Sequence, residues 1–349
     1  MQIAGISFTK QGNQINQQLQ KKMDSYYGYS AHATAEAYGL ESPREQITKN
    51  DWISQWTRQM FQTKGALIFI GATGIAVRAI APFVKDKYED PAVLVIDERG
   101  RYVIPILSGH MGGANELAEK ISKLIGATAV ITTATDLEGV FAVDEFARRN
   151  DLLIGNRDLA KQISVRLLSG ERIGISSAIP LLGALPSQLY LEESKYDICI
   201  SPFLPTSRNG EDKEVLFLYP RMIYIGVGCK KGIAELMLLD FVREELEKSE
   251  INPKAVKAVA SIDLKAEEPA LLNLCKQNGW DFQCYSAEKL LQAEGEFTDS
   301  SFVEQTTGVG NICERAAIIS SGGRLLQKKT ARDGMTLAIA IRERSVQFG

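Results

Sequence analysis

Short apolar runs that end in glycine-bearing turns and lead into amphipathic helices constrain the fold of this chain more than any other feature. The most informative example, 104–121, passes from an apolar strand through a polar turn into a helix that begins near Gly112. Glycines let the backbone approach a ligand closely, and the first N–H groups and positive dipole end of a helix attract anions. The segment is typical of a site that binds an acid or handles an acyl group.

The same alternation of strand-like and helix-like segments continues along the chain and indicates an α/β protein. Trp52, Trp56 and Met60 recur at helical spacing, which predicts a core stripe. Asp97–Gly100 predicts a hairpin turn. We expect strands at 2–8, 66–71, 92–96, 102–107, 127–132, 196–201, 222–229, 256–262 and 335–340, and helices near Ile15, Leu19 and Met23, after Gly112 up to Gly126, at 157–168, and through Leu236, Leu239, Val242 and Leu246.

A chain of 349 residues is too long for one compact core. We expect an N-terminal α/β domain at 1–139, a variable middle region at 140–220 and a C-terminal α/β domain at 221–349. The predicted architecture is therefore two three-layer α/β domains with mainly parallel or mixed sheets, joined through a smaller middle region. Within that region, the polar, proline-bearing piece at 202–213 predicts a surface linker.

The charge balance excludes some classes of partner. With 40 basic and 43 acidic side chains, a net charge of −3 and no basic tail, we expect neither a nucleic acid nor a membrane as a partner. The N-terminus lacks the pattern of a secretory signal, so we expect a cytoplasmic protein. The apolar stretch 65–84 imitates a membrane span, but Arg78 near its middle would cost about 2.5–3.5 kcal/mol there. A buried strand, a turn and a short helix explain it better.

The cysteines and histidines predict neither a disulfide framework nor a metal site. The number of cysteines is odd, and no two of them form a Cys-x-x-Cys pair. The chain has only two histidines, which lie far apart in the sequence. We expect most of these thiols to pack as small apolar side chains. The cysteines are Cys199, Cys229, Cys275, Cys284 and Cys313.

Three further glycine turns stand between a strand and a helix, where a phosphate or carboxylate cradle would lie. They are Gly71–Arg78, Gly226–Gly232 and Thr307–Glu314. The first two match neither the dinucleotide fingerprint nor the Walker loop, which argues against nucleotide binding. A purely structural role is the alternative for each, because tight strand-to-helix turns need glycine with or without a ligand.

Closely spaced charges follow the strand at 256–262. Asp263, Lys265, Glu267 and Glu268 lie where ligands of α/β sheets usually bind. The alternative is a helix-capping cluster, since acidic side chains stabilise a helix start.

His110 lies in the turn of the 104–121 segment, beside Ser108, Gly112 and Gly113. The ordinary imidazole pKa of about 6.5 suits proton transfer near neutral pH, whereas the alternative is a structural hydrogen-bonding role. Ser108 is outside a Gly-x-Ser-x-Gly elbow, and a triad would have to use the neighbouring His110. We therefore do not expect nucleophilic serine chemistry.

Taken together, the motifs resemble the CbiG family of cobalamin-biosynthesis proteins, whose members are cobalt-precorrin-5A hydrolases. The resemblance is carried by the segments 71–82, 90–93, 107–118, 131–136, 226–232, 260–269 and 307–317. It is faint over 140–220. No single motif justifies the assignment, but their order along the chain does.

The resemblance implies an enzyme that acts on a cobalt-bearing, partly methylated corrinoid. Its ring-A acetate is closed as a δ-lactone; water opens the lactone and the bridging two-carbon fragment leaves as acetaldehyde. No added cofactor is implied, because cobalt arrives inside the substrate. The macrocycle carries many carboxylates, for which the glycine turns and Arg78, Lys230, Lys231 and Lys265 offer partners. Transient contact with other enzymes of the pathway is a further expectation.

The expected mechanism assigns His110 as the base that accepts a proton from the attacking water, while N–H groups around Gly112 and Gly113 stabilise the oxyanion. Asp263 or Glu267 would supply a second acid or base if the two domains face each other. The expected substrate-binding residues are Gly71, Thr73, Gly74, Arg78, Ser108, Gly109, Gly112, Gly113, Asn115, Gly228, Cys229, Lys230, Lys265, Thr307, Gly308 and Gly310.

Two other functions stay open at the level of sequence. The first is a non-catalytic corrinoid-binding or hand-over protein of the same pathway, which would bind tightly without producing acetaldehyde. The second is a nucleotide-dependent α/β enzyme, which would be stabilised against heat by ATP or NAD.

Overall fold

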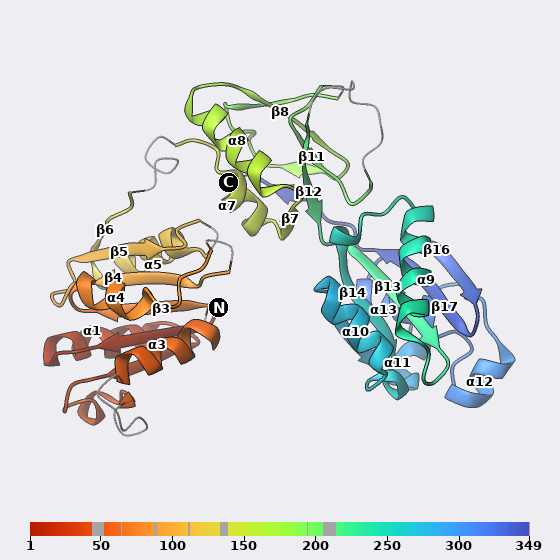
Figure 1. Ribbon diagram of the computed structural model, residues 1–349, viewed down its shortest axis with the longest axis horizontal. Coiled ribbons are helices and arrows are strands. Elements are labelled where there is room, and N and C mark those ends of the chain that lie inside the picture. The colour runs from red at the N-terminus through yellow and green to blue at the C-terminus, as the bar shows by residue number, and fades with distance from the viewer. Residues whose placement is uncertain are drawn as a thin grey trace. The chain divides into compact units, whose positions relative to one another are not determined.

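The computed structural model describes residues 1–43, 52–63, 65–86, 89–110, 112–132, 139–193, 195–204 and 214–348. It divides into two compact units, Met1–Glu145 and Phe146–Gly349 (Figure 1). No helix among these residues is long and apolar enough to cross a membrane.

The first unit is built on a six-stranded sheet in the order β2-β1-β3-β4-β5-β6. β2, β1, β3 and β4 are parallel, β5 runs antiparallel to β4, and β6 is parallel to β5. The strands are β1 (Ile3–Ser7), β2 (Tyr26–Ser30), β3 (Ala66–Ile70), β4 (Ala92–Ile96), β5 (Tyr102–Leu107) and β6 (Thr128–Ala129). The helices are α1 (Lys10–Lys22), η1 (Glu36–Tyr38), α3 (Trp52–Thr63), α4 (Thr73–Ile80) and α5 (Ala114–Ile125), followed by α7 (Val143–Arg149), which crosses into the second unit.

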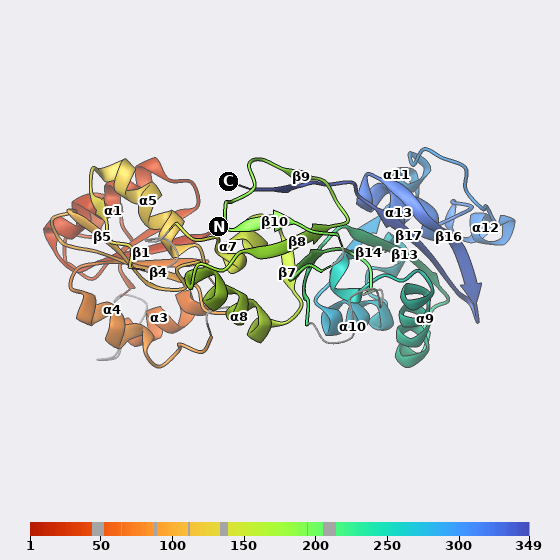
Figure 2. The ribbon, with the colours of Figure 1, turned by 90° about the horizontal axis from the view of Figure 1, so that it is seen from above.

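Two hydrophobic cores lie on the two faces of this sheet. α1 and α5 cover one face and α3 and α4 the other, as Figure 2 shows. Leu19 and Ile121 are wholly buried in the first core, and Trp56 and Met60 are buried in the second, which confirms the predicted core stripe. The unit therefore has the predicted three layers.

The reversal at Asp97–Gly100 decides where the later motifs of this unit lie. The predicted hairpin is confirmed: Gly100 has a left-handed φ of 65°, and the Asp97 carboxylate accepts N–H groups of Arg99, Arg101 and Tyr102. Partial burial raises the pKa of Asp97, but these N–H donors lower it more, and the net pKa lies below its usual value. Because β5 is reversed, its end at Leu107 pairs with Val93 near the start of β4.

The second unit contains two larger sheets. The first, in the order β10-β8-β11-β12-β7, is parallel apart from β7. Its strands are β7 (Leu152–Ile154), β8 (Ile173–Ser177), β10 (Leu189–Leu191), β11 (Ile198–Ile200) and β12 (Leu216–Pro220), with helix α8 (Arg157–Leu168), while β9 (Leu181–Leu182) pairs with β18 (Val346–Gln347). The helix predicted at 157–168 is confirmed. Of the predicted linker at 202–213, residues 205–213 lie outside the described residues.

The C-terminal sheet has the order β15-β14-β13-β17-β16. β13, β14 and β15 are parallel, whereas β17 runs antiparallel to both β13 and β16. Its strands are β13 (Ile223–Cys229), β14 (Val256–Ile262), β15 (Asp281–Tyr285), β16 (Arg324–Arg332) and β17 (Met335–Ile341). The helices are α9 (Glu235–Lys248), η2 (Pro253–Ala255), η3 (Asp263–Lys265), α10 (Pro269–Asn278), α11 (Ala287–Leu291), α12 (Ser301–Thr307) and α13 (Cys313–Ser321).

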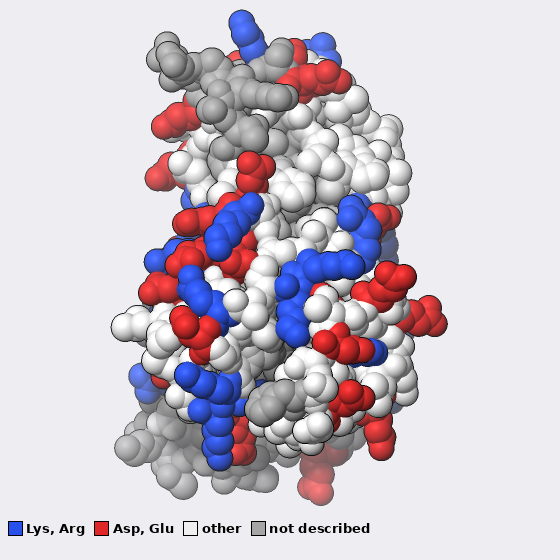
Figure 3. Space-filling model, turned by 90° about the vertical axis from the view of Figure 1, so that its right-hand side faces the viewer, with Lys and Arg blue, Asp and Glu red and all other residues white. Residues whose placement is uncertain are grey.

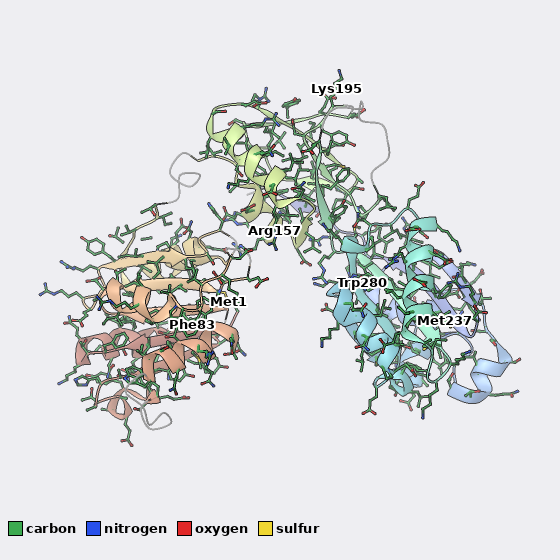
Figure 4. The ribbon with its side chains drawn as sticks, in the orientation of Figure 1. Met1, Phe83, Arg157, Lys195, Met237 and Trp280 are labelled. Atoms are coloured by element: carbon green, nitrogen blue, oxygen red, sulfur yellow. The ribbon has the colours of Figure 1, made fainter. Side chains whose placement is uncertain are left out.

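This sheet also lies between two helical layers. α9 and α10 are on one side and α11 and α13 on the other (Figure 2). In Figure 4, Met237 marks the first turn of α9, which follows β13, and Trp280 precedes β15 at the other end of the parallel strands. The carboxyl ends of β13 and β14 are therefore the ends nearer Met237.

Two local predictions differ from the structure, and several strands were not predicted. Of the apolar face predicted for α9, Val242 and Leu246 are buried as expected, but Leu236 is 73% exposed. The helix also buries Leu238 and Phe241, so its apolar face is displaced from the predicted one by a fraction of a turn. β6 is shorter than the strand expected at 127–132, and the next residues, 133–138, lie outside the described residues. Of the described strands, nine were not predicted, namely β2, β7, β8, β9, β10, β12, β15, β16 and β18.

Candidate functional site

The C-terminal sheet carries a cavity of about 730 Å³ at the carboxyl ends of β13 and β14. Ligands of α/β folds usually bind at such ends. The cavity is lined by Gly228, Cys229, Lys230, Lys231, Ile262, Leu264, Lys265, Val303, Thr306, Thr307, Gly310, Asn311, Ile312, Cys313, Lys329, Ala331, Arg332, Asp333, Gly334, Met335 and Thr336.

Glycines in β13 allow the helix behind the cavity to approach the strand. A Cβ on Gly226 would lie 1.8 Å from the carbonyl oxygen of Cys313, so only glycine fits against the first turn of α13. A Cβ on Gly228 would lie 2.6 Å from the Thr336 hydroxyl of the neighbouring strand. The glycines predicted to bind a ligand thus serve first to bring α13 and β17 close to β13.

The β16–β17 hairpin forms one wall of the cavity. Asp333 and Gly334 both have left-handed backbones, with φ of 51° and 82°, as a two-residue hairpin turn requires. The N–H of Lys230 donates to the carbonyl of Gly334 at 2.9 Å, which ties this turn to the end of β13. The hairpin brings Lys329 and Arg332 to the cavity.

A buried carboxylate organises the opposite wall. Glu314 is wholly buried in the first turn of α13, and it accepts hydrogen bonds from the N–H of Lys329 at 2.7 Å and of Thr298 at 2.8 Å. Asn311 donates to the same carboxylate at 2.7 Å and accepts the N–H of Glu314 at 2.9 Å. This reciprocal pair resembles a capping box and fixes the segment that carries Gly310 and Asn311.

A second buried carboxylate lies behind the third wall. Glu268 is 6% exposed, and its two oxygens accept the N–H of Gly232 at 3.0 Å and the ammonium of Lys265 at 3.1 Å. The Lys265 side chain is 15% exposed and lines the cavity. Glu268 thereby joins the loop after β13 to η3.

The lining of the cavity is cationic. Of the described residues that line it, five are Lys or Arg and one, Asp333, is acidic. In Figure 3, Lys and Arg side chains gather around a mostly uncharged part of the surface. Burial raises the pKa of the Cys229 thiol, Lys265 lowers it and Glu268 raises it, and the net pKa lies above the usual value. The thiol is therefore neutral near pH 7. The cationic lining suits the cavity to a large, anionic, partly apolar ligand.

The structure gathers most of the site residues predicted in the second unit and leaves three outside. Asp263 and Glu267 are exposed and do not line the cavity; the Asp263 carboxylate accepts the N–H of Leu264 at 2.8 Å. Gly308 ends α12 with a left-handed φ of 78° and is also outside the lining. The predicted residues that line the cavity are Gly228, Cys229, Lys230, Lys265, Thr307 and Gly310.

Several lining residues were missed by the sequence analysis, among them Asn311, Lys329, Arg332 and Asp333. A signal was present for the last three. Asp333-Gly334 is among the strongest hairpin signals in a sequence, and it precedes the strand predicted at 335–340. A hairpin there would have placed a basic strand beside the predicted one.

The two predicted motifs of the first unit lie at opposite ends of the strands of its sheet. Gly71–Arg78 follows β3, and the Gly71 N–H donates to the carbonyl of Ile96 at the end of β4. The Ser108–Asn115 turn follows the reversed β5 and lies near the start of β4, where a Cβ on Gly112 would be 3.1 Å from the Ala92 nitrogen. Thr73, Gly74 and Arg78 are exposed on α4. The described residues of this unit therefore do not bring the two motifs together in one site.

In the Ser108–Asn115 turn, hydrogen bonds occupy the backbone N–H groups and neighbouring atoms occupy the space beside the glycines. The N–H groups of Gly113, Ala114 and Asn115 donate to the carbonyls of His110, Ser108 and Gly109 at 3.1, 3.2 and 3.1 Å. The oxyanion role expected for Gly113 would require its bond to open. A Cβ on Gly109 would lie 2.9 Å from the Asn115 side chain, so packing alone accounts for this glycine.

Ser108 and His110 have distinctive surroundings in that turn. Ser108 has a left-handed φ of 54° and a buried hydroxyl for which the described residues provide no hydrogen-bond partner. The His110 side chain is 17% exposed, and its Nδ1 lies 3.8 Å from an oxygen of Glu145. That separation is too long for a hydrogen bond.

The other histidine lies at the carboxyl edge of β2. His32 Nδ1 lies 2.9 Å from the Thr34 hydroxyl and accepts the Thr34 N–H at 3.2 Å. Thr34 in turn accepts a hydrogen bond from Asn13. Because Nδ1 accepts, the proton of the neutral ring is on Nε2. Among the described residues, no group of three or more His, Cys, Asp or Glu side chains could hold a metal ion.

Comparisons with known proteins cover most of the chain. Three family profiles match in order: Cobalamin synthesis G N-terminal at 55–136, Cobalamin biosynthesis central region at 141–220, and Cobalamin synthesis G C-terminus at 223–340. A cobalt-precorrin-5A hydrolase of Salmonella typhimurium is 37% identical over 301 residues, which cover 81% of this chain and 84% of that protein. A cobalt-precorrin-5A hydrolase of Priestia megaterium is 30% identical over 81% of this chain and 80% of that protein.

Among solved structures, the crystal structure of a cobalamin biosynthesis protein G homolog from Sulfolobus solfataricus is similar to this chain. It has a TM-score of 0.42 and 24% sequence identity, and the match covers 98% of this chain and 97% of that one.

Proposed function

The chain belongs to the cobalamin synthesis G family, and from this we infer that it is a cobalt-precorrin-5A hydrolase of anaerobic cobalamin biosynthesis. Two relatives of that name cover four fifths of its length. The reaction adds water to the ring-A δ-lactone of the corrinoid and releases the bridging two-carbon fragment as acetaldehyde. The product is cobalt-precorrin-5B.

The observation that supports this function best is the cation-lined cavity of the C-terminal sheet. A corrinoid intermediate is a large macrocycle with an apolar face and a rim of carboxylates. Charge-assisted hydrogen bonds from Lys or Arg to carboxylates are about twice as strong as neutral ones. We propose that Lys230, Lys265, Lys329 and Arg332 bind rim carboxylates while Ile262, Ile312 and Met335 contact the macrocycle.

Opening of the lactone requires a base for the attacking water, and it leaves a carboxylate on the ring and a free hydroxyl on the two-carbon fragment. The carbon–carbon bond then breaks as this hydroxyl loses its proton to form acetaldehyde, and a second group donates a proton to the ring carbon left behind. His110 stays the proposed base, because its ring lies beside the Glu145 carboxylate, which would stabilise the imidazolium formed after proton transfer. For the second group we propose Asp333, which is the carboxylate in the cavity lining, in preference to Asp263 and Glu267, which lie outside it. No resident cofactor is proposed, because the cobalt belongs to the substrate.

The decisive experiment is a single-turnover reaction of the purified chain with cobalt-precorrin-5A. We expect stoichiometric acetaldehyde, trapped as a hydrazone, and a corrinoid product whose mass is that of cobalt-precorrin-5B. Tight corrinoid binding without acetaldehyde would contradict the hydrolase function and support a hand-over protein. The cytoplasmic location expected from the sequence stays a prediction.

The proposed base is tested by His110→Asn, which preserves a polar side chain but removes the titratable ring. General bases contribute about 10²- to 10⁴-fold to rate, so we expect acetaldehyde release to slow by at least about 100-fold. A loss below about threefold would exclude His110 as the base. His32→Asn is the matched control from the other histidine.

A further inference from the structure

Among the cations of the cavity, Lys265 is distinguished by the burial of its ion pair: Arg332 also pairs with a carboxylate, Glu244, but those two side chains are 35% and 46% exposed. The Lys265 side chain is 15% exposed, whereas Lys230 and Lys231 are exposed residues at the end of β13. Its ammonium lies 3.1 Å from Glu268, which is itself 6% exposed and absent from the cavity lining. A lysine side chain has four rotatable bonds and would lose much conformational entropy on binding a ligand if it were free.

Capping of α10 does not explain Glu268. Although Glu268 directly precedes the first residue of the helix, Pro269, its side chain makes no capping hydrogen bond. One carboxylate oxygen accepts the N–H of Gly232 instead, 36 residues earlier, and the other accepts from Lys265. The carboxylate thus points to the back of the cavity wall and away from the start of its own helix.

Stability alone is also a weak reason for this buried pair. Removing two charges from water costs free energy that their attraction only partly offsets, and apolar pairs of similar volume often stabilise a fold equally well. The contrast with Glu314 is informative, because the hydrogen bonds that Glu314 accepts come from backbone N–H groups, Asn311 and the Thr298 hydroxyl. One of the two carboxylate oxygens of Glu268 instead accepts a hydrogen bond from an ammonium that faces the cavity.

We propose that Glu268 is a positioning residue that holds the Lys265 ammonium in place to receive one carboxylate of the bound corrinoid. The inference rests on the proposed function. Because the Gly232 N–H also binds Glu268, the carboxylate sets Lys265 relative to the loop that carries Lys230. The two cations are then spaced before the ligand arrives, which reduces the entropy lost on binding.

Positioning and simple electrostatics predict changes of opposite sign. Glu268 brings a negative charge close to an anion-binding cavity, so its neutralisation should strengthen the binding of a polycarboxylate if charge alone matters. If Glu268 positions Lys265, neutralisation should weaken binding, because the lysine is released. Glu268→Gln is the suitable change, since the amide oxygen can still accept the Gly232 N–H.

The experiment titrates the full chain with cobyrinic acid, a cobalt corrinoid polycarboxylate, and follows the visible absorption of the corrinoid. The variants are Glu268→Gln, Lys265→Met and the double variant, with Glu247→Gln on the exposed side of α9 as the matched control. Thermal unfolding of each variant is recorded. We expect dissociation constants about tenfold higher for Lys265→Met and about fivefold higher for Glu268→Gln, with the control unchanged.

The double variant separates positioning from a general structural effect. If Glu268 acts through Lys265, the double variant should bind no more weakly than Lys265→Met alone, because the two changes are coupled. Binding of Glu268→Gln that equals or exceeds that of the unchanged chain would overturn the proposal, and so would fully additive losses. If the unchanged chain binds no cobyrinic acid, the proposed role of the cavity in corrinoid binding fails as well, whereas normal binding with an indifferent Glu268→Gln contradicts only the positioning role. The hydrolase function is tested separately by acetaldehyde release.

Discussion

The N-terminal and C-terminal sheets share an architecture but differ in what their glycine turns do. Both sheets lie between two layers of helices, and in both a strand ends in a glycine turn before a helix. In the Ser108–Asn115 turn, the first N–H groups of α5 are bonded to backbone carbonyls, and neighbouring atoms fill the space beside Gly109 and Gly112. After β13, the corresponding space is a cavity of about 730 Å³. A glycine turn alone is therefore not a binding site.

The cavity exists because of walls that the N-terminal sheet lacks. The hairpin β16–β17 continues past the end of β13, and the segment from α12 to α13 faces it. The buried Glu314 carboxylate bonds to both of these walls, through Lys329 and Asn311. The buried Glu268 fixes a third wall, formed by the loop after β13 and η3. The proposed polycarboxylate site therefore differs from the N-terminal turn in two respects: it is a cavity enclosed by walls, and those walls carry cations.

The largest effect is expected at a glycine of the C-terminal sheet, where close packing requires that there be no side chain. In Gly226→Ala the new Cβ would lie 1.8 Å from the Cys313 carbonyl oxygen, and backbone cannot move aside cheaply. We expect a loss of about 3 kcal/mol in the free energy of unfolding, at the upper end of overpacking effects. Urea unfolding followed by circular dichroism measures it. A loss below about 1 kcal/mol would mean that α13 and β13 are not in close contact.

A smaller effect is expected from a single cation of the rim. Lys230→Met removes one charge-assisted hydrogen bond to a substrate carboxylate, and we expect the KM for cobalt-precorrin-5A to rise about tenfold with little change in kcat. Lys276→Met, an exposed position on α10 outside the cavity, is the matched control. Equal KM values for the two variants would remove Lys230 from the site.

The attachment of the hairpin wall to α9 is expected to depend on pH. Burial raises the pKa of Glu245, but hydrogen bonds from Lys248, Thr330 and Gln327 lower it more, and the net pKa lies below the usual value. A depressed pKa in the folded state means that the stabilisation is complete above the unfolded pKa of about 4.3 and is lost as the pH falls through the folded value. We expect Glu245→Gln to cost about 1 kcal/mol at pH 7.

This pH dependence is measured by urea unfolding of both forms between pH 7 and pH 3. The difference between the unchanged chain and Glu245→Gln should shrink as the pH falls below about 4. A difference that is constant with pH would show that the charge of Glu245 is not what ties β16 to α9.

The smallest effect, of opposite sign, is expected in the N-terminal unit. A Cβ on Gly74 meets no atom within 4 Å, and the residue lies in the first turn of α4. Gly74→Ala should therefore stabilise the chain by about 0.5 kcal/mol through the lower entropy of the unfolded state. Thermal unfolding beside Gly226→Ala gives the comparison directly. Destabilisation by Gly74→Ala would show that this glycine is needed for its backbone conformation.

Much of the fold follows from local sequence patterns. The strands at 92–96 and 102–107 and the helix at 157–168 coincide with the structure, because apolar runs bounded by turn residues leave few alternatives. The hairpin at Asp97–Gly100 was also predicted, and it already implies that β5 is reversed. The separation of the two N-terminal motifs to opposite ends of the strands follows from that reversal.

The cavity could be predicted only in part. Its floor after β13 comes from the predicted turn, but its wall pairs Gly228 with Thr336, 108 residues later, and such a pairing depends on strand order. The irregular register between Leu325 and Thr330 also hides the alternation expected of β16. Glu268 was seen only as one of several charges near a helix start, because its partner Gly232 is distant in sequence.

Above all, we propose that the corrinoid binds in the C-terminal cavity through contacts between its carboxylates and the cations of the lining. The most direct measurement compares the affinity of the full chain for cobyrinic acid with its affinity for the uncharged methyl ester of the same corrinoid, at one ionic strength. Several charge-assisted contacts of about 1.5 kcal/mol each predict binding of the acid at least about 100-fold tighter than that of the ester. Equal affinities for the two corrinoids would contradict the account.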